Sequence, residues 1–263
     1  MTTPTLADYI AAHDTMFAHF NDLCGRLTVE DLAGPTLCPD WDVRGVISHV
    51  IGVEQVLDGW APSIEDPPPF RQIRAFQAEV AGLDPADFTA RMAAITSSRL
   101  ADLRSRDPSV VDVPSITPTG IGTYGGFLRI RVFDLWVHAR DIAIPMGEQL
   151  DDSGAAAELA LAEVAGSIGY IVGKKIGLPD GTSVVFHVTG GVSRDLAVVV
   201  DGRARAVEAV ESPDVEVTAD VGTFVMLAAG RVDPQEQIDA RTISWTGNAE
   251  WGERAARTLA YTM

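Results

Sequence analysis

GFLRIRVFDLWVHARDIAIPM, the stretch from Gly126 to Met146, has the length and apolar content of a buried helix, yet one of its sides is charged. At about 100° per residue, the side that includes Phe127 and Ile130 also carries four ionisable residues. These are Arg131, Asp134, His138 and Asp141. Buried charges are costly unless they have partners. The four groups therefore need one another, a metal ion or a substrate.

Two of these residues, Asp134 and His138, have the spacing of a metal-binding pair. Residues four apart stack on one helical face with Cβ atoms roughly 5–6 Å apart, so a carboxylate and an imidazole can hold one ion. A third ligand is available in His49, on the apolar face of a helix predicted from Val43 to Trp60. Metal sites in helical bundles are built from facing helices. Two histidines and a carboxylate suit a catalytic zinc or a ferrous iron.

The neighbouring residues allow more than one interpretation. A single histidine on an apolar face is most often a core residue, and His13, near the inner stripe of the first predicted helix, is either that or a fourth ligand. Asp141 follows His138 by three residues, which favours a role behind the metal or at the helix end. Arg131 precedes Asp134 by one turn, where it either neutralises the carboxylate or meets an anionic substrate.

The composition is that of a globular protein with an acidic surface. Of the 263 residues, 46% are hydrophobic and 22% are charged, which permits a sizeable core. The net charge of −17 argues against nucleic acid and anionic membranes as partners. The N-terminal residues lack the basic flank and apolar segment of a signal peptide, and no run of about 18 apolar residues predicts a membrane span. We therefore expect a cytosolic protein with reduced cysteines, Cys24 and Cys38, neither of which has an adjacent base in the sequence.

Hydrophobic periodicity predicts four long helices in the first part of the chain. They span Leu6–Leu27, Val43–Trp60, Asp84–Arg106 and the charged stretch, and together they predict an antiparallel four-helix bundle over residues 1–150. Asp42 is the expected N-cap of the second helix, and Pro85 occupies the first position of the third. The segment Asp107–Gly125, rich in Pro, Ser, Thr and Gly, is predicted to be a long loop.

The pattern changes in the second part of the chain. Residues 151–178 predict an Ala-rich helix that connects two domains. Residues 179–263 alternate β-rich segments with helices, and Asp201-Gly202 marks a hairpin. Strands are expected at Ser183–Val188, Leu196–Val200, Val215–Ala219 and Ile243–Trp245, and helices at Val221–Ala229 and Ala249–Tyr261. The fold class is therefore α+β, a helical bundle followed by a small α+β domain.

One motif imitates a dinucleotide site. Residues Gly120 to Gly125, GIGTYG, match G-x-G-x-x-G, and Asp141 follows at about the expected interval. That fingerprint requires a strand before the glycines, within a βαβ unit. The residues before it include Pro114 and Pro118, which a buried parallel strand does not tolerate well. We therefore do not expect this motif to bind NAD or FAD.

The chain contains LCPDWDVR at Leu37 to Arg44, RVFDLWVHARD at Arg131 to Asp141, and a tail that begins at Asp214. These three segments together resemble the mycothiol-dependent maleylpyruvate isomerase family, whose members have a DinB-like metal-binding bundle. Residues Leu37 to Arg44, LCPDWDVR, are similar to the family's C-P-x-W-x-V-R segment, which precedes its first metal-binding histidine. Residues Arg131 to Asp141, RVFDLWVHARD, are similar to its R-x-x-E-x-x-x-H-x-x-D pattern. The tail that begins at Asp214 and includes Gly247-Asn248-Ala249 resembles its sterol-carrier-protein-like C-terminal domain.

The resemblance implies a divalent metal (zinc first, then iron, nickel or manganese) held by His49, Asp134 and His138. It also implies a low-molecular-weight thiol, mycothiol in this family, as cosubstrate. A thiol on a metal loses its proton near neutral pH, so we expect thiol transfer to, or thiol-assisted isomerisation of, a small electrophile. Asp141 and Arg131 would orient the metal ligands. Asp134 departs from the family pattern, which has Glu here, and its side chain is about 1.5 Å shorter.

Two other functions fit the same residues. A set of two histidines and one carboxylate also suits a mononuclear non-haem iron enzyme that uses oxygen. The other alternative is a non-catalytic protein that holds a lipid or small molecule in its second domain. In the thiol-dependent enzyme, the substrate is expected between the bundle, the Asp107–Gly125 segment and the second domain, with Arg231 and Arg241 as candidates for binding its carboxylate groups. No pattern in the sequence indicates the electrophile or the oligomeric state.

Overall fold

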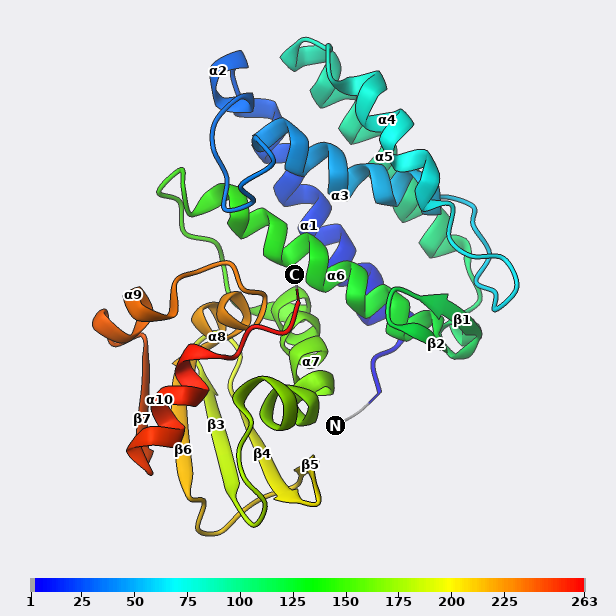
Figure 1. Cartoon of the computed structure of the whole chain (residues 1–263). Coiled ribbons are helices and arrows are strands. Elements are labelled where there is room, and N and C mark those ends of the chain that lie inside the picture. Colours follow the sequence, from blue (N-terminus) through cyan, green and yellow to red (C-terminus); the bar gives the residue numbers. More distant parts are fainter. Residues whose placement is uncertain (1–2, 263) are drawn as a thin grey trace. The chain divides into compact units, whose positions relative to one another are not determined.

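The structure, a computed structural model, describes residues 3–262. The chain divides into two compact units, Met1–Leu150 and Asp151–Met263. The first unit is mainly helical, and the second contains a five-stranded sheet together with helices (Figure 1). The α+β class expected from the sequence, a helical bundle followed by a small α+β domain, is therefore confirmed.

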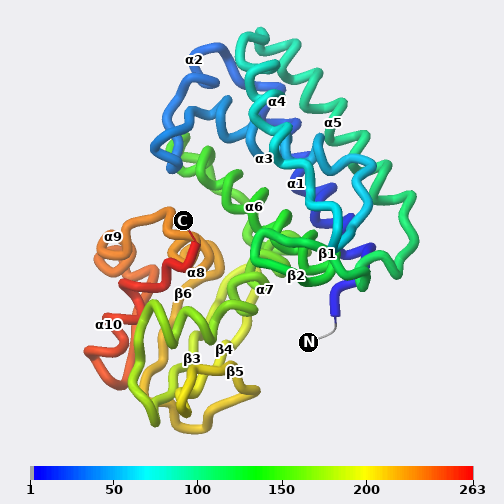
Figure 2. The backbone as a smooth tube through the Cα atoms, turned by 45° about the vertical axis from the view of Figure 1, so that its right-hand side comes forward, coloured from blue at the N-terminus to red at the C-terminus, as the bar shows by residue number. Residues whose placement is uncertain are grey.

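Four long helices form the first unit: α1 (Leu6–Arg26), α3 (Val43–Leu57), α5 (Pro85–Ser105) and α6 (Tyr124–Ala143). Both α1 and α3 pack against α5 and α6, so α1 and α3 lie diagonally across the bundle (Figure 2). The core between the helices is mainly apolar, and its largest buried side chains include Phe17, Phe20 and Trp136. It also contains buried charged residues, among them Glu54 and Arg99. This packing places α3 beside α6, and these two helices carry the three predicted metal ligands.

Each of these helices begins at a side chain that caps its free N–H groups. Thr5, Asp84 and Thr123 precede α1, α5 and α6, and their side chains accept hydrogen bonds from the first turn. Asp42, the predicted cap of α3, accepts a hydrogen bond of 2.7 Å from the backbone N–H of Gly45. Such a cap contributes on the order of 1 kcal/mol. The starting points of the bundle helices are thus encoded locally.

The sequence pattern does not predict the short elements between the long helices. They are α2 (Val29–Leu32), the 3₁₀ helix η1 (Phe70–Gln72) and α4 (Ile73–Val80). A helix of one or two turns is too short to show a clear periodicity. α4 packs on α3 because Gly52 leaves room for the ring of Phe76, whose Cδ1 would lie 2.6 Å from a Cβ at that position.

The segment Asp107–Gly125 is not the long loop that its composition predicts. It contains the 3₁₀ helix η2 (Pro108–Asp112) and an antiparallel hairpin of β1 (Pro114–Thr117) and β2 (Gly120–Thr123). Gly120 lies at the turn with φ of +117°, a value that side chains rarely allow. The glycines of the G-x-G-x-x-G match thus belong to this hairpin and to the start of α6, and they do not form the βαβ unit of a dinucleotide site.

The second unit is built around a sheet with the strand order β5-β4-β3-β6-β7. β3 and β6 are parallel, and each other neighbouring pair is antiparallel. Gly202, with φ of +65°, turns the β4–β5 hairpin as predicted. The residues of β5, RARAV, offer no apolar run, which is why the sequence pattern does not predict this strand. The strands are β3 (Ser183–Thr189), β4 (Arg194–Asp201), β5 (Arg203–Val207), β6 (Val215–Asp220) and β7 (Ile243–Gly247).

Four helices accompany the sheet: α7 (Gly154–Tyr170), α8 (Val221–Ala228), α9 (Pro234–Asp239) and α10 (Ala249–Arg257). α7 continues as a π-helical segment, η3 (Ile171–Ile176), and ends at Gly177 with φ of +67°. α7 packs against α8 and against strands β4 and β5. The segment predicted as a connecting helix, residues 151–178, therefore belongs to the second unit. The sequence pattern does not predict α9, which has only 6 residues.

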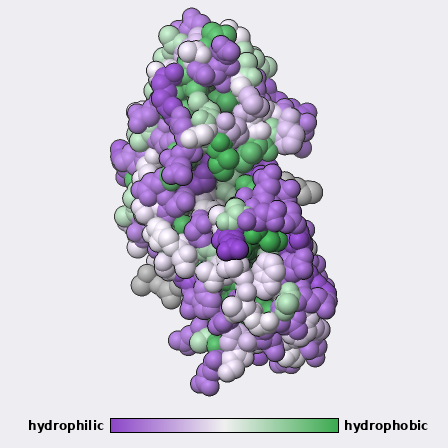
Figure 3. All heavy atoms as spheres, turned by 90° about the vertical axis from the view of Figure 1, so that its left-hand side faces the viewer, coloured by the Kyte–Doolittle hydropathy of each residue, from purple (hydrophilic) through white to green (hydrophobic). Residues whose placement is uncertain are grey.

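One helix, Gly154–Ile176, is long and apolar enough to cross a membrane by length and composition, although the sequence predicts no such span. Of its most apolar window, 56% is buried inside the protein. A helix at the core of a domain passes the same test, and Glu158 and Glu163 interrupt this one. Hydrophilic side chains cover most of the face shown in Figure 3. The helix packs against strands β4 and β5 of the sheet, and this packing is sufficient to explain why one of its sides is apolar.

Candidate metal centre

The three predicted ligands come together in the first unit. His49 lies on α3, and Asp134 and His138 lie one turn apart on α6. One ligand atom of each residue lies within 4.8 Å of the others. His49 Nε2 is 3.9 Å from Asp134 Oδ2, and His138 Nε2 is 3.6 Å from Asp134 Oδ1. The two helices thus bring together two imidazole nitrogens and one carboxylate.

These separations fit a divalent cation. Two ligands of a tetrahedral zinc ion, each about 2.1 Å from the metal, lie about 3.4 Å apart. The separations of 3.6 and 3.9 Å, each to a different oxygen of Asp134, are slightly longer than this value. One ligand atom of each residue lies within 4.8 Å of the others, which is within the reach of a shared cation after a small adjustment of the side chains. The side chains of His49 and Asp134 are 25% and 27% exposed, whereas that of His138 is 5% exposed. The site is therefore closed toward the core and open on one side, as catalytic metal sites are.

Asp134 is ionised at neutral pH. Burial alone would raise the pKa of this carboxyl group, but the guanidinium of Arg131 and the imidazoles of His138 and His49 lower it to about 2. Arg131 Nη1 donates a hydrogen bond of 2.8 Å to Asp134 Oδ2. The carboxylate therefore offers a cation its negative charge without first releasing a proton.

The second nitrogen of the His138 ring faces the core. His138 Nδ1 lies 2.8 Å from Oδ2 of Asp141, which is fully buried. A carboxylate accepts hydrogen bonds, so Nδ1 carries the proton and Nε2 presents its lone pair to the metal position. Carboxylates commonly orient metal-binding histidines in this way. The arrangement supports the role behind His138 that the sequence predicts for Asp141.

Cys38 adds a thiol to this pair. Its Sγ lies 3.1 Å from Asp141 Oδ2 and 3.7 Å from His138 Nδ1, so the fold supplies a neighbouring base, the Asp141 carboxylate, that the sequence does not show. These three residues form a second group that could hold a metal. However, the Nδ1–Oδ2 separation of 2.8 Å is that of a hydrogen bond and is shorter than the distance of about 3.4 Å between two zinc ligands. The inner group therefore fits a hydrogen-bonded triad better than a metal site.

The other cysteine, Cys24, has an unreactive thiol. Cys24 is buried on α1, and burial raises the pKa of its thiol to about 12. A thiol with such a pKa is protonated at neutral pH and is a poor nucleophile. This environment and the lack of an adjacent base in the sequence both argue against Cys24 as a catalytic nucleophile.

Trp41 lies against both histidine rings. Its ring centroid is 4.6 Å from that of His49, at an interplanar angle of 35°, and 6.0 Å from that of His138. The residue is fixed in the turn before α3, where Thr36 Oγ1 donates a hydrogen bond of 2.7 Å to its carbonyl oxygen. Sequence reasoning assigns Trp41 no role, because periodicity does not show what a residue outside a helix contacts.

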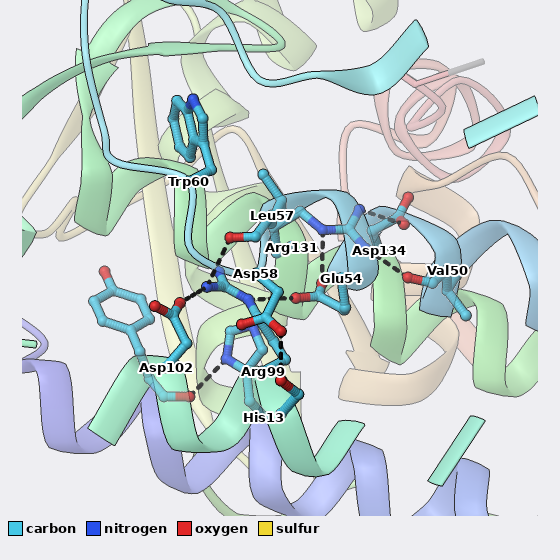
Figure 4. Close-up of polar contacts among 12 residues, drawn as sticks. His13, Val50, Glu54, Leu57, Asp58, Trp60, Arg99, Asp102, Arg131 and Asp134 are labelled. Carbon is cyan, nitrogen blue, oxygen red and sulfur yellow. Dashed lines mark hydrogen bonds and ion pairs between the residues drawn. The ribbon is translucent and has the colours of Figure 1, made fainter. Parts of the chain in front are cut away.

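Arg131 and Glu54 extend the site into the core of the bundle (Figure 4). Arg131 Nε donates to Glu54 Oε1 at 2.9 Å, and Nη2 donates to the carbonyl of Val50 at 3.3 Å. With Nη1 bonded to Asp134, each nitrogen of this guanidinium has a partner within the protein, and the side chain is 6% exposed. Of the two predicted roles of Arg131, neutralising Asp134 is therefore favoured over binding substrate. Sequence reasoning overlooked Glu54, although it is the one acidic residue in α3.

The remaining predicted residues lie elsewhere. His13 is fully buried on α1, where its Nδ1 lies 2.7 Å from the carbonyl oxygen of Tyr9 and where burial lowers its pKa. Within residues 3–262, His13 is in neither group of side chains that could hold a metal, so the core interpretation is favoured over a fourth ligand. Arg231 and Arg241 lie in the second unit, and their role in binding carboxylate groups stays a prediction.

Comparisons with known proteins point to one family. The family model for the mycothiol maleylpyruvate isomerase N-terminal domain matches residues 14–143, and the model for the MDMPI C-terminal domain matches residues 158–254. A crystal structure of the mycothiol-dependent maleylpyruvate isomerase is 18% identical, covers 88% of this chain and 93% of its own, and gives a TM-score of 0.60. A mutant of that enzyme gives a TM-score of 0.59. At this identity, the likeness shows that the fold is shared.

The other similar proteins give less information about the family of this chain. Two uncharacterised proteins from strains of Mycobacterium tuberculosis are 27% identical over 146 residues, which is 55% of this chain and 70% of each relative. Sterol carrier protein 2 from Yarrowia lipolytica covers 40% of this chain with a TM-score of 0.29, so the sterol-carrier-like assignment of the second domain stays a prediction. The two family models cover most of the chain, one in each compact unit. The chain therefore belongs to the mycothiol-dependent maleylpyruvate isomerase family.

Proposed function

We propose that this protein is a metal-dependent enzyme that uses a low-molecular-weight thiol, mycothiol, to modify or isomerise a small electrophile. The convergence of His49, Asp134 and His138 on one half-buried position carries this proposal. Membership of a family named for a mycothiol-dependent isomerase supports the choice of thiol. Zinc is the metal that we expect first, and the cytosol is the expected compartment.

The residues around the site have complementary tasks. His49, Asp134 and His138 would hold a divalent cation, which would lower the pKa of a thiol bound to it so that the thiolate would be available near neutral pH. Asp134 supplies a negative charge that is present at neutral pH, because its pKa is about 2. Asp141 keeps the proton of His138 on Nδ1. The ring of Trp41 packs beside the two imidazoles, and the exposed edges of His49 and Asp134 leave room for the thiol and the electrophile.

Metal content provides the first test. The purified chain should contain about one divalent metal ion, and the His49→Ala, His138→Ala double variant should lose it. Metal retention should also weaken in acid, because a protonated imidazole cannot bind a cation. His187→Ala is the matched control, since this histidine lies on β3 in the second unit and its loss should leave metal content unchanged. Full occupancy in the double variant would exclude the site as described.

The thiol needs a separate test. Mycothiol added to the cobalt-substituted protein near neutral pH should produce a thiolate-to-metal absorption band, and the metal-free protein should produce none. A free thiol has a pKa of about 8.5 and stays mostly protonated there. If no small thiol alters the spectrum at millimolar concentration, the thiol-dependent function is excluded. Oxygen consumption that requires iron would then favour the oxygen-using enzyme, and a lipid extracted from a metal-free protein would favour the binding protein.

A further inference from the structure

Glu54 is a buried carboxylate shared by two buried arginines. Its side chain and that of Arg99 are fully buried, and Arg131 is nearly so. Arg99 Nε donates to Glu54 Oε2 at 3.1 Å, and Arg131 Nε donates to Glu54 Oε1 at 2.9 Å. The chain of contacts continues from Arg131 Nη1 to Asp134 Oδ2 at 2.8 Å (Figure 4). A row of alternating charges therefore leads from the core of the bundle to the candidate metal centre.

A contribution to the stability of the fold does not by itself explain why these charged residues are buried in a row. Charged groups removed from water lose hydration that their mutual attraction restores only in part, and apolar side chains of similar size often stabilise a core as well. The surface of α3 around Glu54 is apolar, and Val50, Val53 and Leu57 are buried there. An apolar residue at position 54 would continue this surface. If Glu54 positions another side chain, this explains why position 54 holds an acidic residue and not an apolar one.

The contact between Glu54 and Arg131 joins the two helices that supply the metal ligands. Glu54 lies on α3 five residues after His49, and Arg131 lies on α6 three residues before Asp134. Arg131 Nη2 also donates to the carbonyl of Val50, the residue that follows His49. The guanidinium is thus attached to α3 at two points. It cannot move away from Asp134 without breaking both contacts.

We propose that Glu54 is a positioning residue of the metal centre and acts through Arg131 on Asp134. Arg131 holds Asp134 Oδ2, which leaves Oδ1 on the side of His138 Nε2, 3.6 Å away. An aspartate reaches about 1.5 Å less far than the glutamate of the family pattern, so its carboxylate depends more on being held in place. This inference rests on the proposed function, since it takes the three residues to be metal ligands.

Glu54→Gln in the 263-residue chain tests the proposal, because it keeps the shape of the side chain and removes its charge. Zinc affinity of the folded protein, measured by competition with a chromophoric chelator, should fall, and by no more than the roughly 10–100-fold that loss of a direct partner of a metal ligand costs, because Glu54 acts through Arg131. The absorption spectrum of the cobalt-substituted protein should change as well, because Asp134 is no longer fixed. A loss of stability alone would not alter that spectrum.

Asp102→Asn is the matched control. Asp102 pairs with Arg99 at the far end of the network, and its partners do not include Arg131. The substitution also turns a carboxylate of this network into an amide, and it should leave zinc affinity and the cobalt spectrum unchanged. A decrease in affinity equal to that of Glu54→Gln would mean that any disturbance of the network weakens the site, and this would overturn the specific role of Glu54.

A double-mutant cycle isolates the action through Arg131. In an Arg131→Gln background, Glu54→Gln should reduce zinc affinity no further, and full additivity would overturn the inference. If Glu54→Gln does not fold, Glu54→Asp takes its place, since it keeps the charge but withdraws the carboxylate from Arg131. The inference would also be overturned if the Glu54 variant that folds, Gln or Asp, has the zinc affinity and the cobalt spectrum of the unmodified protein. Absence of zinc binding in the unmodified protein would instead contradict the proposed function.

Discussion

The short side chain of Asp134 has one carboxylate, and this group lies next to the guanidinium of Arg131 and the imidazoles of His49 and His138. Oδ2 accepts a hydrogen bond from Arg131 and lies 3.9 Å from His49 Nε2, while Oδ1 lies 3.6 Å from His138 Nε2. A glutamate here would reach about 1.5 Å further. The ligand atoms nevertheless converge within 4.8 Å of one another, so the shorter side chain is compatible with a metal site in this chain.

We expect Asp134→Ala to remove thiol-dependent activity and to lower zinc affinity by more than the roughly 100-fold that loss of an outer partner can cause. Helix α6 should persist, because alanine is the best helix former. Asp134→Glu should have a milder effect, since it keeps the charge and has the length of the family pattern. Zinc competition titration and circular dichroism check both variants. Unchanged metal binding and turnover in Asp134→Ala would make another carboxylate, such as Asp141, the ligand.

At the scale of single elements, α6 could be predicted well from its sequence. Periodicity gives the faces of one helix, so the common side of Arg131, Asp134 and His138 follows from their spacing alone. Periodicity does not give the rotation of one helix against another. The contact of Glu54 with Arg131, and that of Cys38 with Asp141, join residues far apart in the sequence and depend on that rotation.

The proximity of His49 to the two candidate ligands on α6, Asp134 and His138, depends on the same rotation. The assignment of this third ligand therefore rests on the family resemblance, while the apolar periodicity of α3 only places the residue on its inner face. Short elements escape prediction for a different reason. α4 and β5 are too brief or too polar for a pattern of their own, and contacts with neighbouring elements decide their structure.

The sheet of the second unit places a histidine between two acids from neighbouring strands. His187 on β3 has its Nδ1 2.7 Å from Oδ1 of Asp195 on β4 and its Nε2 3.5 Å from Oε1 of Glu216 on β6. The hydrogen bond to Asp195 raises the pKa of His187 above 6.5, and the effect of burial is opposite but smaller. The charged form is therefore favoured in the folded state.

This raised pKa predicts the direction of a pH effect. The contribution of His187 to stability should be complete below pH 6.5, the ordinary pKa of the group, and should be lost as the pH rises through the raised value. An NMR titration of the imidazole should show His187 titrating above 6.5, and Asp195→Asn should move its pKa back toward that value. Titration at or below 6.5 in the unmodified protein would contradict the prediction.

At the scale of the whole molecule, the chain consists of two compact units with different chemistry. The residues of the candidate metal site lie in Met1–Leu150, and the five-stranded sheet lies in Asp151–Met263. Each unit has its own buried apolar residues, such as Phe20 in the first and Phe186 in the second. Units with separate cores can unfold separately, and a ligand stabilises only the unit whose folded state binds it.

Zinc should therefore stabilise the first unit without stabilising the second. A ligand that binds only the folded state adds about 2.7 kcal/mol at a free concentration of 100 times its Kd. In the 263-residue chain, hydrogen exchange followed by mass spectrometry should show slower exchange in α3 and α6 when zinc is added, and unchanged exchange in β3, β4 and β6. The His49→Ala, His138→Ala variant should show no response in either unit. Equal protection of the strands by zinc would show instead that the two units unfold as one, because a ligand bound in the first unit would then stabilise both.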